Sequence, residues 1–183
     1  MKRILIITAI IVFIVIIVLI SNKIFNNDTY IANEIVPEEE ISDSQLRNTI
    51  ITLYFKNKNV LVPEARYIDA KELITDPYNK ILDLLIKGPK NGNLEGTIPY
   101  GTQINSISKH DDYLIIDFTK EFIENHNGGK EEEIITIRSI VNTVTEFTEI
   151  NGIKILIDGE ENKSYKDNQI TFNNIFKRDL IEQ

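Results

Sequence analysis

The hydrophobic positions of this chain form an unbroken apolar run at the N-terminus and a periodic pattern after residue 47. The run extends from Ile4 to Ile20 and contains one polar residue, Thr8. A helix of this length spans roughly 25 Å at about 1.5 Å per residue, close to the hydrocarbon thickness of a bilayer. Residues 1–20 are therefore predicted to form a short cytoplasmic start and a transmembrane anchor.

The residues that flank the run bear on whether it is an anchor or a secretory signal peptide. A signal peptide usually has a shorter apolar region that ends in small residues of the Ala-x-Ala type. Here the run leads into a polar stretch that starts at Ser21, so we favour an anchor, with cleavage as the alternative. Lys2 and Arg3 should stay in the cytoplasm. We therefore expect a single-pass membrane protein whose C-terminal domain is extracytoplasmic.

A linker and one domain are expected after the anchor. Residues 21–47 lack periodicity and are rich in Asn, Asp, Glu and Ser, which is typical of a flexible acidic or polar linker. As a coil this segment would span roughly 30 Å on average, at about 5 to 6 Å times the square root of its length. Residues 48–183 carry the periodic pattern and are long enough for one domain with its own core.

The first half of the domain is predicted to form a hairpin followed by an amphipathic helix. Residues 49–55 and 60–68 are rich in β-branched and aromatic residues and flank a turn, and Pro63 marks the second segment as an edge strand. The helix should begin at Asp76–Pro77 and end before Gly88–Pro89. Its apolar positions recur at i, i+3, i+4 and i+7, namely Tyr78, Ile81, Leu82 and Leu85.

The second half predicts a second hairpin, a second helix and two short strands. Strands are expected at 103–108, 113–118, 153–157 and 169–172, and the helix at 131–149. Alternation along 113–118 directs Asp117 outward, away from its apolar neighbours. The fold class is α+β, with two amphipathic helices packed on one face of a mixed, mostly antiparallel sheet.

Charge and cysteine usage narrow the function. Outside Lys2 and Arg3, 18 basic residues stand against 28 acidic residues, a net charge of −10. This balance argues against a nucleic-acid partner and against charge-driven docking on anionic lipids. The absence of cysteine excludes disulfides, thiol nucleophiles, cysteine-based metal sites and a lipid-modified cysteine.

Two sets of residues were weighed as chemical sites, and neither is favoured. His110, Asp111, Asp112 and His126 could supply metal ligands, but turn composition explains the same residues. Asp117, Glu121 and Glu124 could supply the carboxylates of a hydrolase, although an acidic chain contains many such pairs by chance. We predict no catalytic, cofactor-binding or metal residues and no cofactor.

Three further patterns have a structural role or could bind a sugar. Glu64 and Arg66 lie two residues apart on one strand and should form an ion pair. The glycines of residues 88–96 follow a helix, whereas a phosphate-binding loop precedes one, so we interpret them as turn residues. Exposed aromatic residues could bind wall polysaccharide, and the candidates are Tyr67, Tyr100, Tyr113 and Tyr165.

Several segments together resemble the GerM domain of sporulation and spore germination proteins. They are Leu53-Tyr54-Phe55, Pro63-Glu64-Ala65-Arg66, Leu84-Leu85 with Gly88-Pro89, Ile98-Pro99 with Gly101-Thr102, Asp117-Phe118 with Glu121-Phe122, Asn142-Thr143, and Ile157-Asp158-Gly159. The similarity covers about Thr49 to Asp179, and the order of the segments is more specific than any one of them.

The resemblance implies a non-catalytic extracytoplasmic module that is similar to ring-building domains. Such a module would help to assemble or localise an envelope complex between the two membranes of a sporulating cell. Its partners would be other envelope or sporulation proteins, and copies of itself in a homo-oligomer or ring. The alternatives are a module that binds peptidoglycan or another polysaccharide, and an envelope hydrolase.

Overall fold

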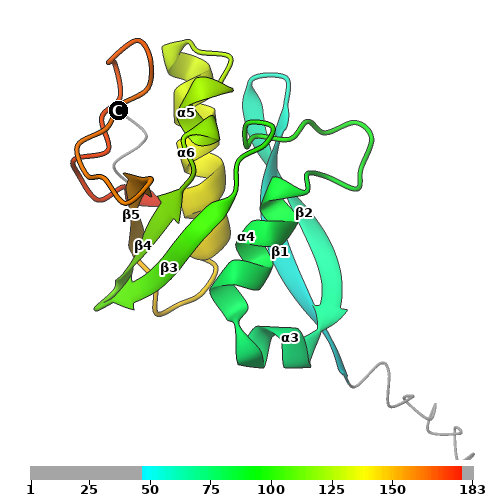
Figure 1. Cartoon of the computed structure of the whole chain (residues 1–183). Coiled ribbons are helices and arrows are strands. Elements are labelled where there is room, and N and C mark those ends of the chain that lie inside the picture. The colour runs from blue at the N-terminus through cyan, green and yellow to red at the C-terminus, as the bar shows by residue number, and fades with distance from the viewer. Residues whose placement is uncertain (1–46, 179–183) are drawn as a thin grey trace, which may run out of the picture. The chain divides into compact units, whose positions relative to one another are not determined.

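The computed structural model describes residues 47–178 (Figure 1), so the predicted anchor and residues 21–46 of the linker lie outside the described residues. Its elements are β1 (Asn48–Asn57), β2 (Val60–Asp69), α3 (Ala70–Thr75), α4 (Pro77–Ile86), β3 (Ile104–His110), β4 (Tyr113–Phe118), α5 (Glu121–Glu124), α6 (Lys130–Val144) and β5 (Gly152–Ile157). Within residues 47–178, no helix is long and apolar enough to cross a membrane.

The first two strands form the predicted hairpin in a regular antiparallel register. The turn is tighter than expected, since only Lys58 and Asn59 lie outside the strands, and Lys58 adopts a positive φ of 54°. Pro63 lies opposite Tyr54, whose backbone N–H and C=O point away from β2. The missing N–H of Pro63 therefore lies on the open side of β2, where it costs the ladder no hydrogen bond.

The first predicted helix, α4, has the expected ends. The Asp76 side chain accepts a hydrogen bond from the Asn79 N–H at 3.4 Å, and Pro77 is the first helical residue. Gly88 follows the C-cap with a φ of 85°, the left-handed conformation that favours glycine. The short helix α3 was not predicted. It begins where the Asp69 side chain accepts from the Lys71 N–H at 2.9 Å.

The strands form two sheets, so the expectation of one continuous sheet is wrong. The hairpin stands alone, and a second sheet has the order β3-β4-β5, with β3 antiparallel and β5 parallel to β4. Side chains of α6 occupy the outer edge of β1 in place of another strand. The Tyr54 N–H donates to Thr143 Oγ1 at 3.2 Å, and the Ser139 hydroxyl donates to the Tyr54 carbonyl at 2.6 Å.

The second predicted helix, α6, ends at Val144, five residues before its predicted end. Thr145 caps it and donates its hydroxyl to the Val141 carbonyl at 2.8 Å, a local bond that competes with continued helix. Phe147 lies beyond the helix but still packs edge-on against Tyr78, with ring centroids 5.2 Å apart. The apolar positions Ile140, Val144 and Phe147 keep a helical spacing, but the last of them lies in the turn that follows α6.

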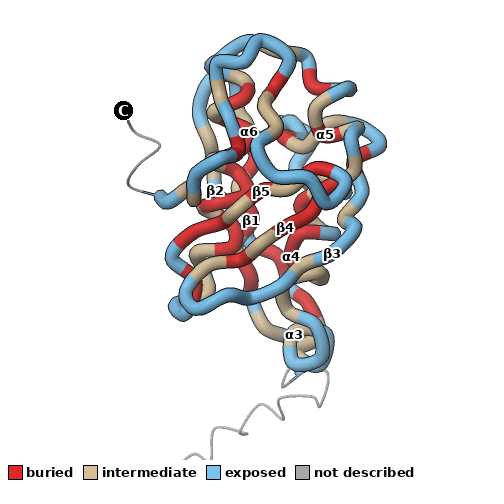
Figure 2. Tube along the Cα trace, turned by 60° about the vertical axis from the view of Figure 1, so that its left-hand side comes forward, coloured by how far each residue is buried: buried red, intermediate tan, exposed pale blue. Residues whose placement is uncertain are grey.

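The core forms where α4 and α6 meet the strands. The two helices contact each other; α4 also contacts β1 and β3, and α6 contacts β1, β2 and β5 (Figure 1). Buried residues concentrate along these contacts (Figure 2). Residues 169–172 do not form the predicted closing strand, because this segment makes only an isolated bridge from Thr171 to Ser164. The short helix α5, like α3, was not predicted.

Candidate functional site

The Pro-Glu-x-Arg and Gly-Pro segments contact each other. Arg66 donates from Nε to Glu64 at 2.5 Å and from Nη2 to the Gly88 carbonyl at 2.8 Å, as the ion-pair prediction required. Glu64 also accepts from the Asn91 N–H at 2.9 Å and from the Lys90 N–H. Burial alone would raise the pKa of Glu64, but these N–H donors and Arg66 hold the pKa below its ordinary value. The pair thus fixes the loop after α4 to β2.

A hydrogen-bonded network inside the domain uses one of the two histidines. His126 Nδ1 accepts from the Gly128 N–H at 3.0 Å, so Nε2 carries the proton and donates to Thr136 Oγ1 at 3.0 Å. Thr136 in turn donates to the Thr97 carbonyl at 2.9 Å. Burial lowers the pKa of His126. The histidine is therefore a neutral structural residue that joins the loop before α6 to the loop at residue 97.

A buried acid lies on the first turns of α6. Glu133 is fully buried, and among the described residues neither of its carboxylate oxygens has a hydrogen-bond partner. Burial, and then the negative charge of Asp167, raise the pKa of Glu133. The hydroxyl of Tyr165 is likewise buried without a partner in the described part of the chain, and burial raises its pKa well above the ordinary value.

The hydrolase candidates do not form a carboxylate pair in one cleft. Asp117 alternates with Leu114, Ile116 and Phe118 along β4, as predicted, but it is buried rather than exposed, and it accepts a hydrogen bond from the Gly159 N–H at 2.9 Å. Glu121 lines a shallow pocket with Lys120 and Asp158, and a hydrogen bond from Thr119 lowers the pKa of Glu121. A general acid needs a raised pKa, so Glu121 does not fit the role of the acid in glycoside hydrolysis, and neither Asp117 nor Glu124 lines this pocket.

The metal candidates are also separated. His110 is exposed at the end of β3, where it stacks on Tyr113, whereas His126 is buried in the network above. No group of three or more His, Asp or Glu side chains within residues 47–178 has the proximity that a metal ion requires.

The four candidate tyrosines divide by exposure. Tyr165 is buried, so it cannot bind a polymer. Tyr113 is half-buried beside His110, whereas Tyr67 and Tyr100 are 72% and 92% exposed. Two tyrosines therefore remain available at the surface.

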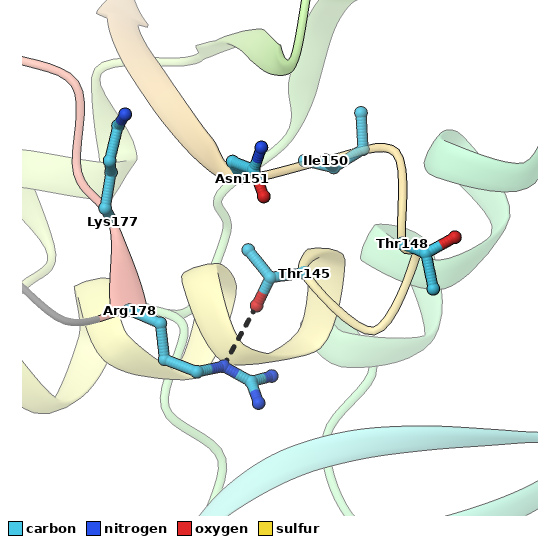
Figure 3. A pocket seen from close by; sticks show the side chains of 6 residues that line it. All are labelled: Thr145, Thr148, Ile150, Asn151, Lys177 and Arg178. Atoms are coloured by element: carbon cyan, nitrogen blue, oxygen red, sulfur yellow. Dashed lines mark hydrogen bonds between the residues drawn. The ribbon is translucent and has the colours of Figure 1, made fainter.

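A pocket of about 410 Å³ lies beside the end of α6 (Figure 3). Arg178 reaches into this region and donates to Thr145 Oγ1 at 3.1 Å, to the Asn142 carbonyl at 2.7 Å and to Glu146 at 2.9 Å. A cation at this position is favourable because the C-terminal end of a helix carries partial negative charge. The guanidinium is already paired, so we interpret these contacts as a tie between the C-terminal segment and α6.

An exposed apolar area covers the outer face of the hairpin, and we call it the hairpin surface. Ile50 and Tyr67 are cross-strand neighbours and are 59% and 72% exposed. Ala65, which lies opposite Thr52 on the same face of the hairpin, is also exposed. Ile50 also borders an apolar pocket of about 190 Å³ that Leu73 and Phe147 help to line.

The edge of β1 beside this surface is open. Along a regular antiparallel ladder, alternate residues point their N–H and C=O away from the partner strand. Tyr54 uses these groups on α6, and Lys56 pairs with the backbone of Glu95 at 3.1 and 2.7 Å. The backbone N–H and C=O groups of Ile50 and Thr52 point in the same direction, and in the described part of the chain no other group is hydrogen-bonded to them. The edge therefore offers backbone donors and acceptors next to an apolar pocket.

A further pocket, which we call the Tyr100 pocket, has a volume of about 240 Å³ and opens between β1, the loop at 95–100, the loop at 125–127 and the start of α6. Lys56, Glu95 and Glu132 lie at its mouth, and His126 and Thr136 line its floor. No pattern in the sequence predicts that these segments lie together.

Comparison with known proteins agrees with this architecture. A model of the Germane family, described as sporulation and spore germination, matches residues 52–163. The first GerMN domain of the sporulation protein GerM from Bacillus subtilis is 25% identical with a TM-score of 0.59, over 72% of this chain and 98% of that one. A predicted lipoprotein from Clostridium perfringens is 28% identical with a TM-score of 0.52, over 73% of this chain and 90% of that one.

The tandem GerMN domains of the Bacillus subtilis protein share the fold at 19% identity and a TM-score of 0.59. The match covers 73% of this chain and 46% of the tandem structure, so this chain spans about half of that protein. No curated protein matches the chain. Since the family model covers more than half of the 183 residues, the chain belongs to the Germane family of sporulation and spore germination domains, as its resemblance to GerM predicted.

Proposed function

We propose that this domain is a non-catalytic protein-interaction module that helps to assemble or localise an envelope complex in sporulating cells. Family membership supports a role associated with sporulation or germination. In this proposal the predicted anchor holds the domain on the outer side of the membrane, and the linker lets it reach partners at roughly 30 Å. The partners are other envelope or sporulation proteins, or further copies of this chain.

The hairpin surface is the observation that carries the proposal. Ile50 and Tyr67 expose apolar area side by side, next to the open edge of β1 at Ile50 and Thr52. A partner strand could pair with this edge and place an apolar side chain in the pocket beside Leu73. Contiguous exposed apolar area of this kind is typical of interaction sites.

Site-specific crosslinking in sporulating cells tests the proposal. A photoreactive amino acid at Tyr67 should yield a discrete adduct with an envelope protein or a second copy. The same amino acid at Ser108, which is exposed on the polar strand β3, should not. Tagged protein should gather at the engulfing septum. Uniform localisation together with normal sporulation after deletion of the gene would reject the role.

A further inference from the structure

The Tyr100 pocket brings an exposed aromatic ring, charged side chains and a hollow together at a place that the hairpin surface does not include. Tyr100 is the most exposed of the large hydrophobic side chains in the described part of the chain, yet its backbone is firmly held. The Thr102 N–H donates to the Pro99 carbonyl at 3.2 Å, Gly101 supplies the positive φ of the turn, and Asn125 donates to the Tyr100 carbonyl at 2.8 Å. A ring presented on a fixed turn loses little conformational freedom when it binds a ligand.

The charges at the mouth define the class of ligand. The Lys56 ammonium lies 2.5 Å from Glu132 and 3.9 Å from Glu95, so one positive charge faces two negative charges. The excess of one negative charge disfavours an anionic ligand. Glu95 is largely exposed, and its carboxylate oxygens can accept hydrogen bonds from hydroxyl or amine groups.

The floor of the pocket is formed before any ligand arrives. His126 and Thr136 are hydrogen-bonded to each other, and the Thr136 hydroxyl also donates to the Thr97 carbonyl, so both side chains are held in place. The volume of about 240 Å³ is smaller than the roughly 300–1,000 Å³ typical of pockets for drug-sized ligands, so it suits a single ring.

We propose that the Tyr100 pocket binds one ring of an oligosaccharide that carries no negative charge. The apolar face of the sugar lies on the Tyr100 ring, and its hydroxyl groups donate to Glu95 and Glu132. This arrangement combines an aromatic platform with hydrogen-bond acceptors, as an amphipathic ring ligand requires.

Calorimetric titration of the full chain with chitotriose tests this site, in a zwitterionic detergent that has no sugar headgroup. Saturable binding is expected, and Tyr100→Ala should weaken it about tenfold, the loss of one stacking contact. Tyr67→Ala removes another exposed tyrosine, which belongs to the hairpin surface, and should bind as the wild type does. Glucuronic acid should not compete.

Charge reversal supplies a second, independent variant. Glu95→Lys changes the mouth from an excess of one negative charge to an excess of one positive charge, and should also weaken chitotriose binding. Absence of saturable binding by the wild type, or wild-type affinity in both Tyr100→Ala and Glu95→Lys, overturns the proposal. Retention on purified peptidoglycan by the wild type but not by Tyr100→Ala would identify the wall polymer as the ligand source, whereas chitotriose binding without retention would identify a soluble oligosaccharide.

Discussion

Replacement of Arg66 by methionine should destabilise the domain by about 3 kcal/mol. Arg66 is 5% exposed, and the substitution removes charge-assisted hydrogen bonds to Glu64 and to the Gly88 carbonyl. It also removes the guanidinium from the Phe55 ring, whose centroid lies 5.6 Å away. Loss of one partner of a buried ion pair costs about 3–5 kcal/mol. We expect a cost at the lower end of this range because Glu64 still accepts hydrogen bonds from the N–H groups of Lys90 and Asn91.

Urea unfolding of the full chain, followed by far-ultraviolet circular dichroism, measures this loss. With a slope of about 2 kcal/mol per molar urea, the midpoint should fall by about 1.5 M. Glu64→Gln is the matched control, because the amide oxygen still accepts from the loop while the negative charge is gone. The double variant should cost less than the sum of the two single variants, since it leaves no unpaired charge. Stability within about 0.5 kcal/mol of the wild type for Arg66→Met, or strict additivity, would refute the reasoning.

Three further predictions use other positions. Burial lowers the pKa of His126 below 6.5, so the unfolded chain takes up a proton at a higher pH than the folded domain does. Stability should therefore fall as pH drops through 6.5. His126→Gln should flatten the dependence of melting temperature on pH between 7.5 and 5.5. Burial raises the pKa of Glu133 above 4.5, so the protonated side chain favours the folded state and this stabilisation is lost as pH rises through the folded-state pKa. Glu133→Gln should therefore raise the melting temperature more at pH 8 than at pH 5. An equal change at both pH values would contradict a buried acid. Gly88→Val should lower the free energy of unfolding by about 1 kcal/mol or more. The cost is backbone strain alone, since no atom lies within 4 Å of the added Cβ. Gly92 has no positive φ, so Gly92→Val should unfold at the wild-type urea midpoint.

The sequence predicts those features of the fold that depend on residues close together in the chain. The capping of α4 by Asp76 and Gly88 depends on a few neighbouring residues, and the pairing of Glu64 with Arg66 depends on strand alternation. Both are confirmed. The end of α6 was misplaced because Phe147 continues the helical spacing, although it packs against Tyr78 from a turn.

What the sequence missed depends on contacts between distant segments. The division into two sheets follows from the hydroxyl groups of Ser139 and Thr143, which bond to Tyr54 on β1. Thr136, Ser139 and Thr143 recur at i, i+3 and i+7, so the spacing does indicate a polar stripe within a buried helix. Without the fold, nothing in the spacing identifies the strand that this stripe bonds to. The burial of Asp117 similarly depends on a distant contact, the hydrogen bond from the Gly159 N–H, 42 residues later in the chain.

The closure of β1 by α6 also bears on self-association into fibrils. A long free edge is a template on which strands can add without limit. Here α6 and Glu95 occupy the edge at Tyr54 and Lys56, and Pro63 removes a donor from the opposite edge of the hairpin. The stretch around Ile50 and Thr52 is too short for the six- or seven-residue segments that stack into fibrils. The domain can accept one partner at this edge and still resist open-ended polymerisation.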